Sequence, residues 1–234
     1  MNEIELYKQH ILEEERIRQQ QVYHKYKDLV PQSSALTNNG RAIPLELLQT
    51  DKSVLLYCYL QLESNWNDNE THRYVWREYY KIRPLLDNLK GQYSKLSSTA
   101  TVTRKLKELI ASDYVDEQNN ALILKNSYFE SLNYALVSQE TLTTLVNFRD
   151  ELLIRVYIWY IWLFYRNNGK AFICFDETLF NNINYSYQSK NKLRLKDIRT
   201  TLLKNGFIEM ASMTRIDHTT GLLKTTNAIR LLKV

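Results

Sequence analysis

One order of segments occurs twice in this chain, and it limits the folds that the chain can adopt. The first copy has an apolar segment at 53–62, an amphipathic segment that begins near Ser98, and then Asp113 ahead of strand-forming residues. The second copy has an apolar segment at 152–165, a second amphipathic segment, and then Gly206 ahead of strand-forming residues. Asp113 and Gly206 lie 93 residues apart. Two copies of one structural module are the simplest interpretation.

Each amphipathic segment is expected to be a helix that ends at a left-handed residue and runs into a hairpin. Glycine at 206 adopts that conformation without strain, and aspartate at 113 is among the few other residues that tolerate it. The hairpin strands are expected at 115–117 with 121–124, and at 210–216 with 222–232. The apolar residues at helical spacing are Val102, Leu106 and Leu109 in the first copy and Leu195, Ile198 and Leu202 in the second.

Helices followed by a hairpin are the order of elements in a winged helix. In the second copy, the apolar run 171–175 predicts the short first strand, and Asp176 is expected to cap a helix over 177–182. A content of only 5 Gly and 3 Pro argues against an all-β sandwich or a nucleotide-binding α/β enzyme, which need many turns. The expected fold class is mainly α with small β-hairpins (α+β), as tandem winged-helix domains joined by a helical linker, plus an N-terminal helix.

The expected domain boundaries follow from these segments. An N-terminal helical arm and linker would occupy 1–42, and the first winged-helix domain 43–126. A helical connector with apolar residues at helical spacing would occupy 127–148, ahead of a second winged-helix domain at 149–234. The arm would dock on the body of the protein or, alternatively, serve as a dimerisation helix.

Positive charge is concentrated in the second copy. The chain has 31 Lys and Arg against 26 Asp and Glu, which gives a net charge of +5 and a pI of about 9.0. From Asp150 to Val234 there are 13 cations and 7 anions, so this part alone carries +6. A mild excess of this kind permits a nucleic-acid partner without demanding one.

Three features predict a cytoplasmic protein without a membrane partner. The chain opens on a charged stretch, MNEIELYKQHILEEE, unlike a secretory signal. The apolar segment at 152–165 contains Arg155 and is shorter than the ~20 residues that span a bilayer, so a buried helix is expected there. Cys58 and Cys174 lie in apolar surroundings and are expected to be free thiols. Insertion of 152–165 at a membrane surface is the alternative.

No arrangement of residues predicts catalysis, a cofactor or a metal. The four histidines, His10, His24, His72 and His218, are scattered and form no HExxH motif. The chain also has no glycine-rich phosphate loop, CxxC pair or GxSxG motif. We therefore expect a protein that is not an enzyme and that uses no cofactor.

The second amphipathic segment has the chemistry of a DNA-reading helix. Its lysines and Arg199 would neutralise phosphates, while Asn191 and Arg194 could bond base edges in the major groove. A solvated charged face is the simpler alternative for a lone helix, but the position just before a hairpin favours DNA. The candidate residues are Ser189, Lys190, Asn191, Lys192, Arg194, Lys196 and Arg199.

Two further groups of residues are candidates for DNA contact. The second hairpin could reach a neighbouring groove through Arg215, His218 and Lys224, although exposed hairpins are often merely polar. The first amphipathic segment begins with hydroxyl residues that could donate to phosphates or simply cap the helix. Its candidate residues are Ser98, Thr99, Thr101, Thr103, Arg104 and Lys107.

Aromatic residues are unusually dense in the segment 152–165. Trp159, Trp162 and Phe164 lie among three tyrosines there, more than one core-facing side of a helix can bury. The excess could pack on the connector, on the N-terminal arm or on a second subunit. A homodimer is one expectation from this segment.

Three short stretches around the start of the first copy form a further pattern. Ile43–Leu48 is apolar and contains proline, Val54–Tyr57 reads VLLY, and Ser64–Asp68 reads SNWND. In this order they resemble the N-terminal winged-helix region of plasmid and phage replication initiators. The resemblance implies that 99–110 is the recognition helix of the first copy. Members of that family usually continue into an unrelated C-terminal region, whereas this chain repeats the module.

Together these patterns predict a double-stranded DNA-binding protein. The expected role is that of a replication initiator or a transcriptional regulator of a plasmid, phage or other mobile element. Its expected partners are double-stranded DNA, a second copy of the chain, and a replication or mobile-element protein. The alternative is a winged-helix adaptor that binds proteins without direct DNA binding, which the modest net charge and the apolar excess at 152–165 favour.

Overall fold

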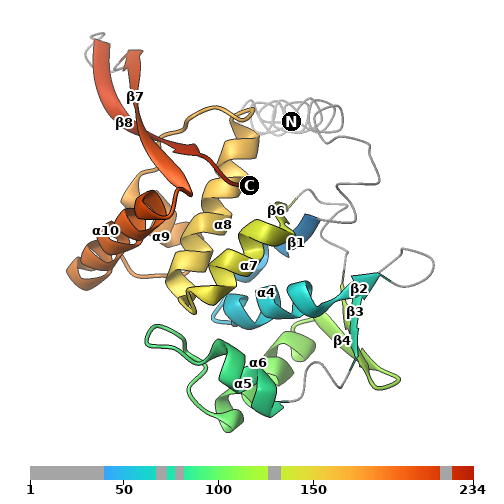
Figure 1. Ribbon diagram of the computed structural model, residues 1–234. Helices are drawn as coiled ribbons and strands as arrows, with labels where there is room; N and C mark the ends of the chain where they lie inside the picture. The colour runs from blue at the N-terminus through green and yellow to red at the C-terminus, as the bar shows by residue number, and fades with distance from the viewer. Residues whose placement is uncertain (1–39, 67–72, 77–81, 126–132, 217–222) are drawn as a thin grey trace, which may run out of the picture. The chain divides into compact units, whose positions relative to one another are not determined.

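The fold combines helices with small β-sheets. The computed structural model describes residues 40–66, 73–76, 82–125, 133–216 and 223–234 (Figure 1). Within these residues the strands form separate small sheets, two of which are antiparallel, and helices make up most of the remainder. The expected α+β class is therefore confirmed. The expected N-terminal helix lies outside the described residues.

The bounds of the described elements, in chain order, are as follows: β1 (Gly40–Pro44), α3 (Leu45–Leu48), α4 (Val54–Glu63), β2 (Asn65–Trp66), β3 (Arg73–Trp76), α5 (Ile82–Leu89), α6 (Thr99–Ala111), β4 (Val115–Gln118), β5 (Ala121–Leu124), β6 (Tyr134–Ser138), α7 (Gln139–Asn147), α8 (Glu151–Arg166), α9 (Asp176–Asn182), α10 (Ser189–Lys204), β7 (Ile208–Ile216) and β8 (Leu223–Leu231).

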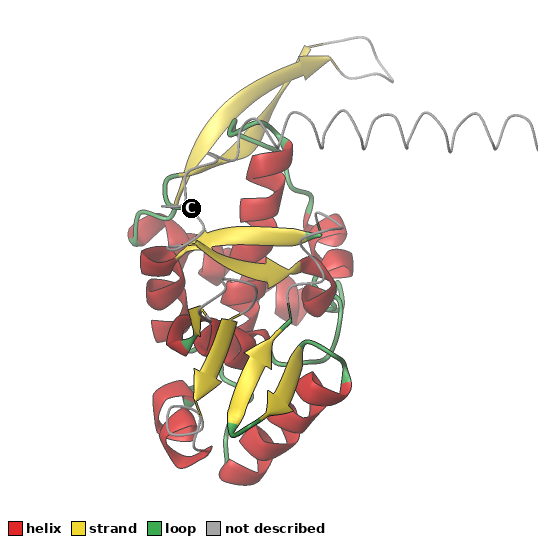
Figure 2. Ribbon diagram, turned by 90° about the vertical axis from the view of Figure 1, so that its right-hand side faces the viewer, coloured by secondary structure: helices red, strands yellow, loops and turns green. Residues whose placement is uncertain are grey.

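The two copies share much of their order of elements and of their strand pairing, but the first copy has an additional strand, β2, which pairs with β3. In the first copy α4 is followed by β3, α5, α6 and the hairpin β4–β5, and β3 pairs antiparallel with β5. In the second copy α8 is followed by α9, α10 and the hairpin β7–β8, and Phe172 forms an antiparallel bridge with Ile229 of β8. The strand expected at 171–175 is thus reduced to this bridge. Figure 2 shows the sheets as separate groups of strands.

The two amphipathic helices end in the same way, as their sequences predict. Asp113 and Gly206 have φ angles of 62° and 66°, both left-handed. After α6, the amide of Tyr114 donates to the carbonyl of Leu109 at 3.1 Å. After α10, the amide of Phe207 donates to the carbonyl of Leu202 at 2.9 Å. This is the Schellman pattern, and it preserves the 93-residue offset between the copies.

Replacing Gly206 by alanine is expected to lower the free energy of unfolding by about 1–2 kcal/mol, because a Cβ is strained in the left-handed region. No atom lies within 4 Å of where that Cβ would be, so backbone strain is the sole cost. Urea unfolding of the two proteins measures the difference. Asp113→Gly is the matched control: it relieves the equivalent strain and removes only an exposed ion pair with Lys125, so it should cost less than about 1 kcal/mol. Superimposable unfolding curves for Gly206→Ala and the wild type would contradict this account.

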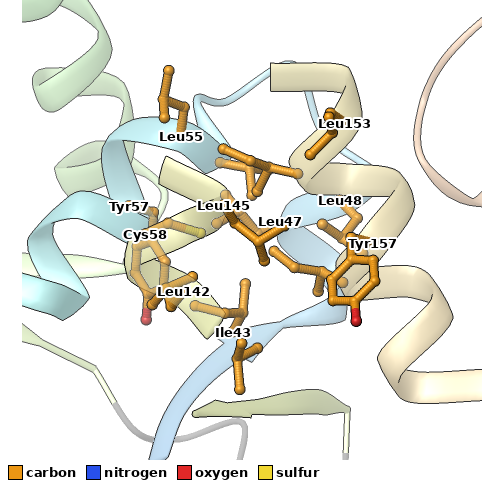
Figure 3. Packing of buried hydrophobic residues seen from close by; sticks show 14 of the residues in the cluster. Ile43, Leu47, Leu48, Leu55, Tyr57, Cys58, Leu142, Leu145, Leu153 and Tyr157 are labelled. Atoms are coloured by element: carbon orange, nitrogen blue, oxygen red, sulfur yellow. The ribbon is translucent and has the colours of Figure 1, made fainter. Parts of the chain in front are cut away.

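A single hydrophobic core runs through both copies. The buried apolar residues of the two copies belong to one contiguous cluster, and Arg41–Val234 forms one compact unit. Figure 3 shows its centre, where residues of β1, α3, α4, α7 and α8 meet. The labelled side chains there are Ile43, Leu47, Leu48, Leu55, Tyr57, Cys58, Leu142, Leu145, Leu153 and Tyr157.

The expected connector differs from a simple helical spacer. Its described part begins as strand β6, which pairs with β1, and continues as helix α7. Leu142, Leu145 and Val146 of α7 are buried, as their helical spacing predicts. The connector is therefore part of the core.

The last residues of the expected N-terminal linker form part of a strand. Gly40 and Arg41 belong to β1, and Arg41 is buried. Its Nε donates to the carbonyl of Gln61 at 2.8 Å and its Nη2 to the Oε1 of Gln139 at 3.0 Å. A linker composition could not reveal this role, because both partners are distant in sequence.

The many aromatic side chains of α8 are packed within the fold of a single chain. Every residue of α8 from Glu151 to Ile161 is buried, and Trp162, Phe164 and Tyr165 pack partly buried against the core. Since the fold covers this helix, its apolar side chains do not require a second subunit. Among the described helices, none combines the length and the hydropathy needed to cross a bilayer.

Candidate nucleic-acid interface

Helix α10 separates an apolar face from a basic one. Leu195, Ile198 and Leu202 are fully buried, as predicted. The helix carries six cations and one carboxylate, Asp197, so it is strongly positive. The exposed residues of α10 are Ser189, Lys190, Lys192, Leu193, Lys196, Asp197, Thr200, Leu203 and Lys204.

Four exposed lysines give this helix its outward charge, and Lys204 among them lies in its last turn. Lys190, Lys192 and Lys196 are exposed, and none makes an ion pair with a described residue. The ammonium of Lys192 lies 3.8 Å from the centroid of the Tyr187 ring. An exposed cation–π contact contributes only about 0.5–1 kcal/mol, so it orients Lys192 without neutralising it.

Arg194, expected to bond base edges, is engaged within the fold. Its guanidinium pairs with the carboxylate of Asp150 and lies 3.6 Å from the centroid of the Tyr93 ring. Asp150 also caps α8 by accepting from the amides of Leu152 and Leu153 at 3.2 and 3.3 Å. Desolvation raises the pKa of Asp150, and the charge of Arg194 opposes that shift. Arg194 thus fixes α10 against the start of α8.

Arg199, expected to neutralise a phosphate, is engaged as well. Its Nε donates to the hydroxyl of Tyr160 at 3.0 Å, and its Nη2 lies 2.8 Å from Oδ1 of Asp176. Burial lowers the pKa of Arg199, but Tyr160 and Asp176 raise it more, so the net shift is upward. The expected cap by Asp176 is wrong: α9 starts at Asp176 itself, and its N-cap, Phe175, makes no side-chain cap hydrogen bond.

Asn191 also has a local partner. Its Nδ2 donates to the carbonyl of Ser186 at 2.7 Å and lies 3.1 Å from the Ser186 hydroxyl. This contact holds the turn that leads into α10, whose N-cap Gln188 makes no side-chain cap hydrogen bond. Asn191, Arg194 and Arg199 therefore position the helix, and the lysines present its charge.

Helix α6 of the first copy exposes far less positive charge than α10. Ser98 caps it by accepting from the amide of Thr101 at 3.2 Å, and the Thr103 hydroxyl donates to the carbonyl of Thr99 at 2.9 Å. Arg104 and Lys105 both pair with Glu108, at 2.5 and 2.7 Å. Hydrogen bonding to Lys105 lowers the pKa of Glu108. Lys107 is exposed and makes no ion pair with a described residue.

The backbone of the second hairpin pairs two of the candidate positions. Register pairing places Arg215 of β7 opposite Lys224 of β8, at the end of the hairpin away from Ile208 and Leu231. His218 lies outside the described residues.

Sequence reasoning missed the segment that precedes α6. Tyr93 lies against Arg194, and the Nζ of Lys95 lies 5.1 Å from the centroid of the Tyr185 ring. The segments that lead into α6 and α10 therefore face each other. A Cβ at Gly91 would lie 2.8 Å from the Cβ of Arg149, so glycine permits the close approach of this segment to the turn between α7 and α8.

Burial raises the pKa of the Cys174 thiol to about 12, so the thiol is protonated at neutral pH and is a poor nucleophile. Among the described residues, no three His, Cys, Asp or Glu side chains gather into a group that could hold a metal ion.

No family model, curated protein or solved structure matches the chain. The arrangement of its own side chains is therefore the basis for assigning a function.

Proposed function

We propose that this protein binds double-stranded DNA and that α10 is its main reading element. The observation that carries the proposal is the contrast between the two amphipathic helices. Helix α10 exposes Lys190, Lys192 and Lys196 without carboxylate partners, whereas Arg104 and Lys105 of α6 share Glu108. Unpaired cations on one helix face are what phosphate binding requires.

The repeated architecture supports a tandem winged-helix assignment. In each copy a helix, a strand or bridge, two helices and a hairpin follow one another, and the first strand or bridge pairs with the second hairpin strand. In such a module the second of the two helices enters the major groove, and the hairpin contacts DNA beside it. Helix α10 and the hairpin β7–β8 would have these roles here.

The resemblance to plasmid and phage replication initiators suggests the biological setting. Strand β1 ends at Pro44, α3 follows directly, and α4 contains the VLLY stretch. The VLLY helix agrees with the resemblance, whereas the apolar, proline-containing stretch 43–48, which corresponds to a strand in that family, is a strand only up to Pro44. We propose a replication initiator or a regulator of a mobile element, acting without catalysis and together with other replication or mobile-element proteins.

Salt-dependent binding of a duplex tests the proposal. The logarithm of the binding constant should fall with the logarithm of salt concentration by about 0.9 for each phosphate neutralised, so the three lysines alone predict a slope of about −2.7. Fluorescence anisotropy with a labelled duplex of arbitrary sequence measures this slope. A protein-interaction adaptor would instead flow through DNA-cellulose at low salt, and that result would refute DNA binding.

A further inference from the structure

The outward face of α10 carries an apolar side chain between its cations. Leu193 is 67% exposed, the most exposed of the large apolar residues in the described chain. It lies two residues before the buried Leu195, which places it about half a turn away from the core-facing side. Lys190 and Lys196 lie three residues before and after it, and residues at this spacing share a helix face.

Asn191 and Arg194, the two residues expected to hydrogen-bond base edges, are already engaged near this position. The amide of Asn191 bonds Ser186, and the guanidinium of Arg194 pairs with Asp150 and lies against Tyr93. The side chain that α10 presents to a base between Lys190 and Lys196 is therefore the isobutyl group of Leu193. In helix-turn-helix proteins the N-terminal residues of the recognition helix contact base edges.

We propose that Leu193 reads the C5-methyl group of thymine in the major groove. The methyl is the apolar feature that distinguishes thymine there, and an apolar side chain contacts it favourably. Lys190 and Lys196 would contact phosphates on either side and hold Leu193 against the base edge. This inference rests on the proposed DNA binding by α10 and makes Leu193 a specificity-determining residue.

Removal of single methyl groups from the DNA tests this proposal. Duplexes are selected from a random pool by the full-length protein, and the enriched sequence is resynthesised with deoxyuridine replacing each thymine in turn. At one or two positions, loss of the methyl should weaken binding by the wild-type protein about fourfold, the effect of exposing one buried methyl. Leu193→Ala should bind the thymine and deoxyuridine duplexes equally at those positions.

Leu203→Ala is the matched control. Leu203 lies in the last turn of the same helix and is 39% exposed, so its replacement should leave the methyl dependence intact. A wild-type protein that binds duplex but ignores every methyl, a Leu193→Ala variant that still senses it, or a selection without an enriched thymine-containing site would overturn the role of Leu193 alone. Absence of duplex binding at low salt would overturn both this inference and the proposed function.

Discussion

Replacing Glu151 by alanine is expected to lower the free energy of unfolding by about 3–5 kcal/mol, the cost of leaving a buried partner charge uncompensated. Glu151 is the first residue of α8 and is 1% exposed. Its carboxylate accepts from the amides of Val54 and Leu55 at 2.6 and 3.2 Å and from the Ser53 hydroxyl at 3.1 Å. Glu151, a residue of the second copy, thereby caps helix α4 of the first copy. Nη2 of Arg155 lies 3.3 Å from Oε1 of Glu151.

Arg155 explains why the loss should be large. Its side chain is 1% exposed, and its Nη1 donates to the carbonyls of Leu48 and Thr50 at 2.6 and 3.1 Å. These contacts hold the guanidinium in place, so the variant would bury an unpaired cation and also uncap α4. Because single domains are stable by only about 5–15 kcal/mol, such a loss brings the protein close to unfolding.

Urea unfolding monitored by tryptophan fluorescence measures the loss for Glu151→Ala. The matched control is the exposed ion pair between Glu209 and Arg230, whose nitrogen and oxygen atoms lie 2.6 Å apart. Glu209→Ala should cost less than about 1 kcal/mol, because solvent screens exposed pairs. Equal losses in the two variants would show that the buried network does not hold the copies together.

Replacing Lys190, Lys192 and Lys196 together by alanine is expected to weaken duplex binding by roughly two to three orders of magnitude at ~0.1 M salt. The slope of the salt dependence should fall by about 2.7, since three phosphates are no longer neutralised. The three side chains are exposed, so the circular dichroism spectrum and the unfolding midpoint should stay as in the wild type. Fluorescence anisotropy across a salt series provides the measurement.

Two comparisons make this result specific. Replacing the same three lysines by arginine keeps the charge and should preserve both the affinity and the slope. Arg199→Ala, in contrast, removes contacts with Tyr160 and Asp176 and is expected to destabilise the fold. An unchanged slope in the triple-alanine variant would remove α10 from the proposed interface.

Local chemistry was enough to predict several elements. The spacing of Leu195, Ile198 and Leu202 marked the buried face of α10, and Asp113 and Gly206 marked the two helix ends. These signals work from sequence because capping, apolar periodicity and left-handed backbone geometry involve residues within a few positions of one another. The hairpins that follow were found for the same reason.

The pairing of distant segments could not be predicted in this way. Strand β1 pairs with β6 across almost the whole first copy, and the segment containing Tyr93 faces α10. Asp176 was expected to be a helix cap because aspartate often caps helices. In the structure its carboxylate instead forms an ion pair with Arg199. Such contacts depend on how segments that are distant in the sequence pack together.

The sequence by itself determined where the basic helix lies, which of its sides is apolar and where it ends. Only the tertiary structure decided which of its cations face outward. Arg194 and Lys196 are two residues apart, yet Arg194 meets Asp150, 44 positions earlier, while Lys196 remains exposed. The physical reason is that an ion pair forms where the packed core brings opposite charges within reach, and that distance is set by the fold of the entire chain.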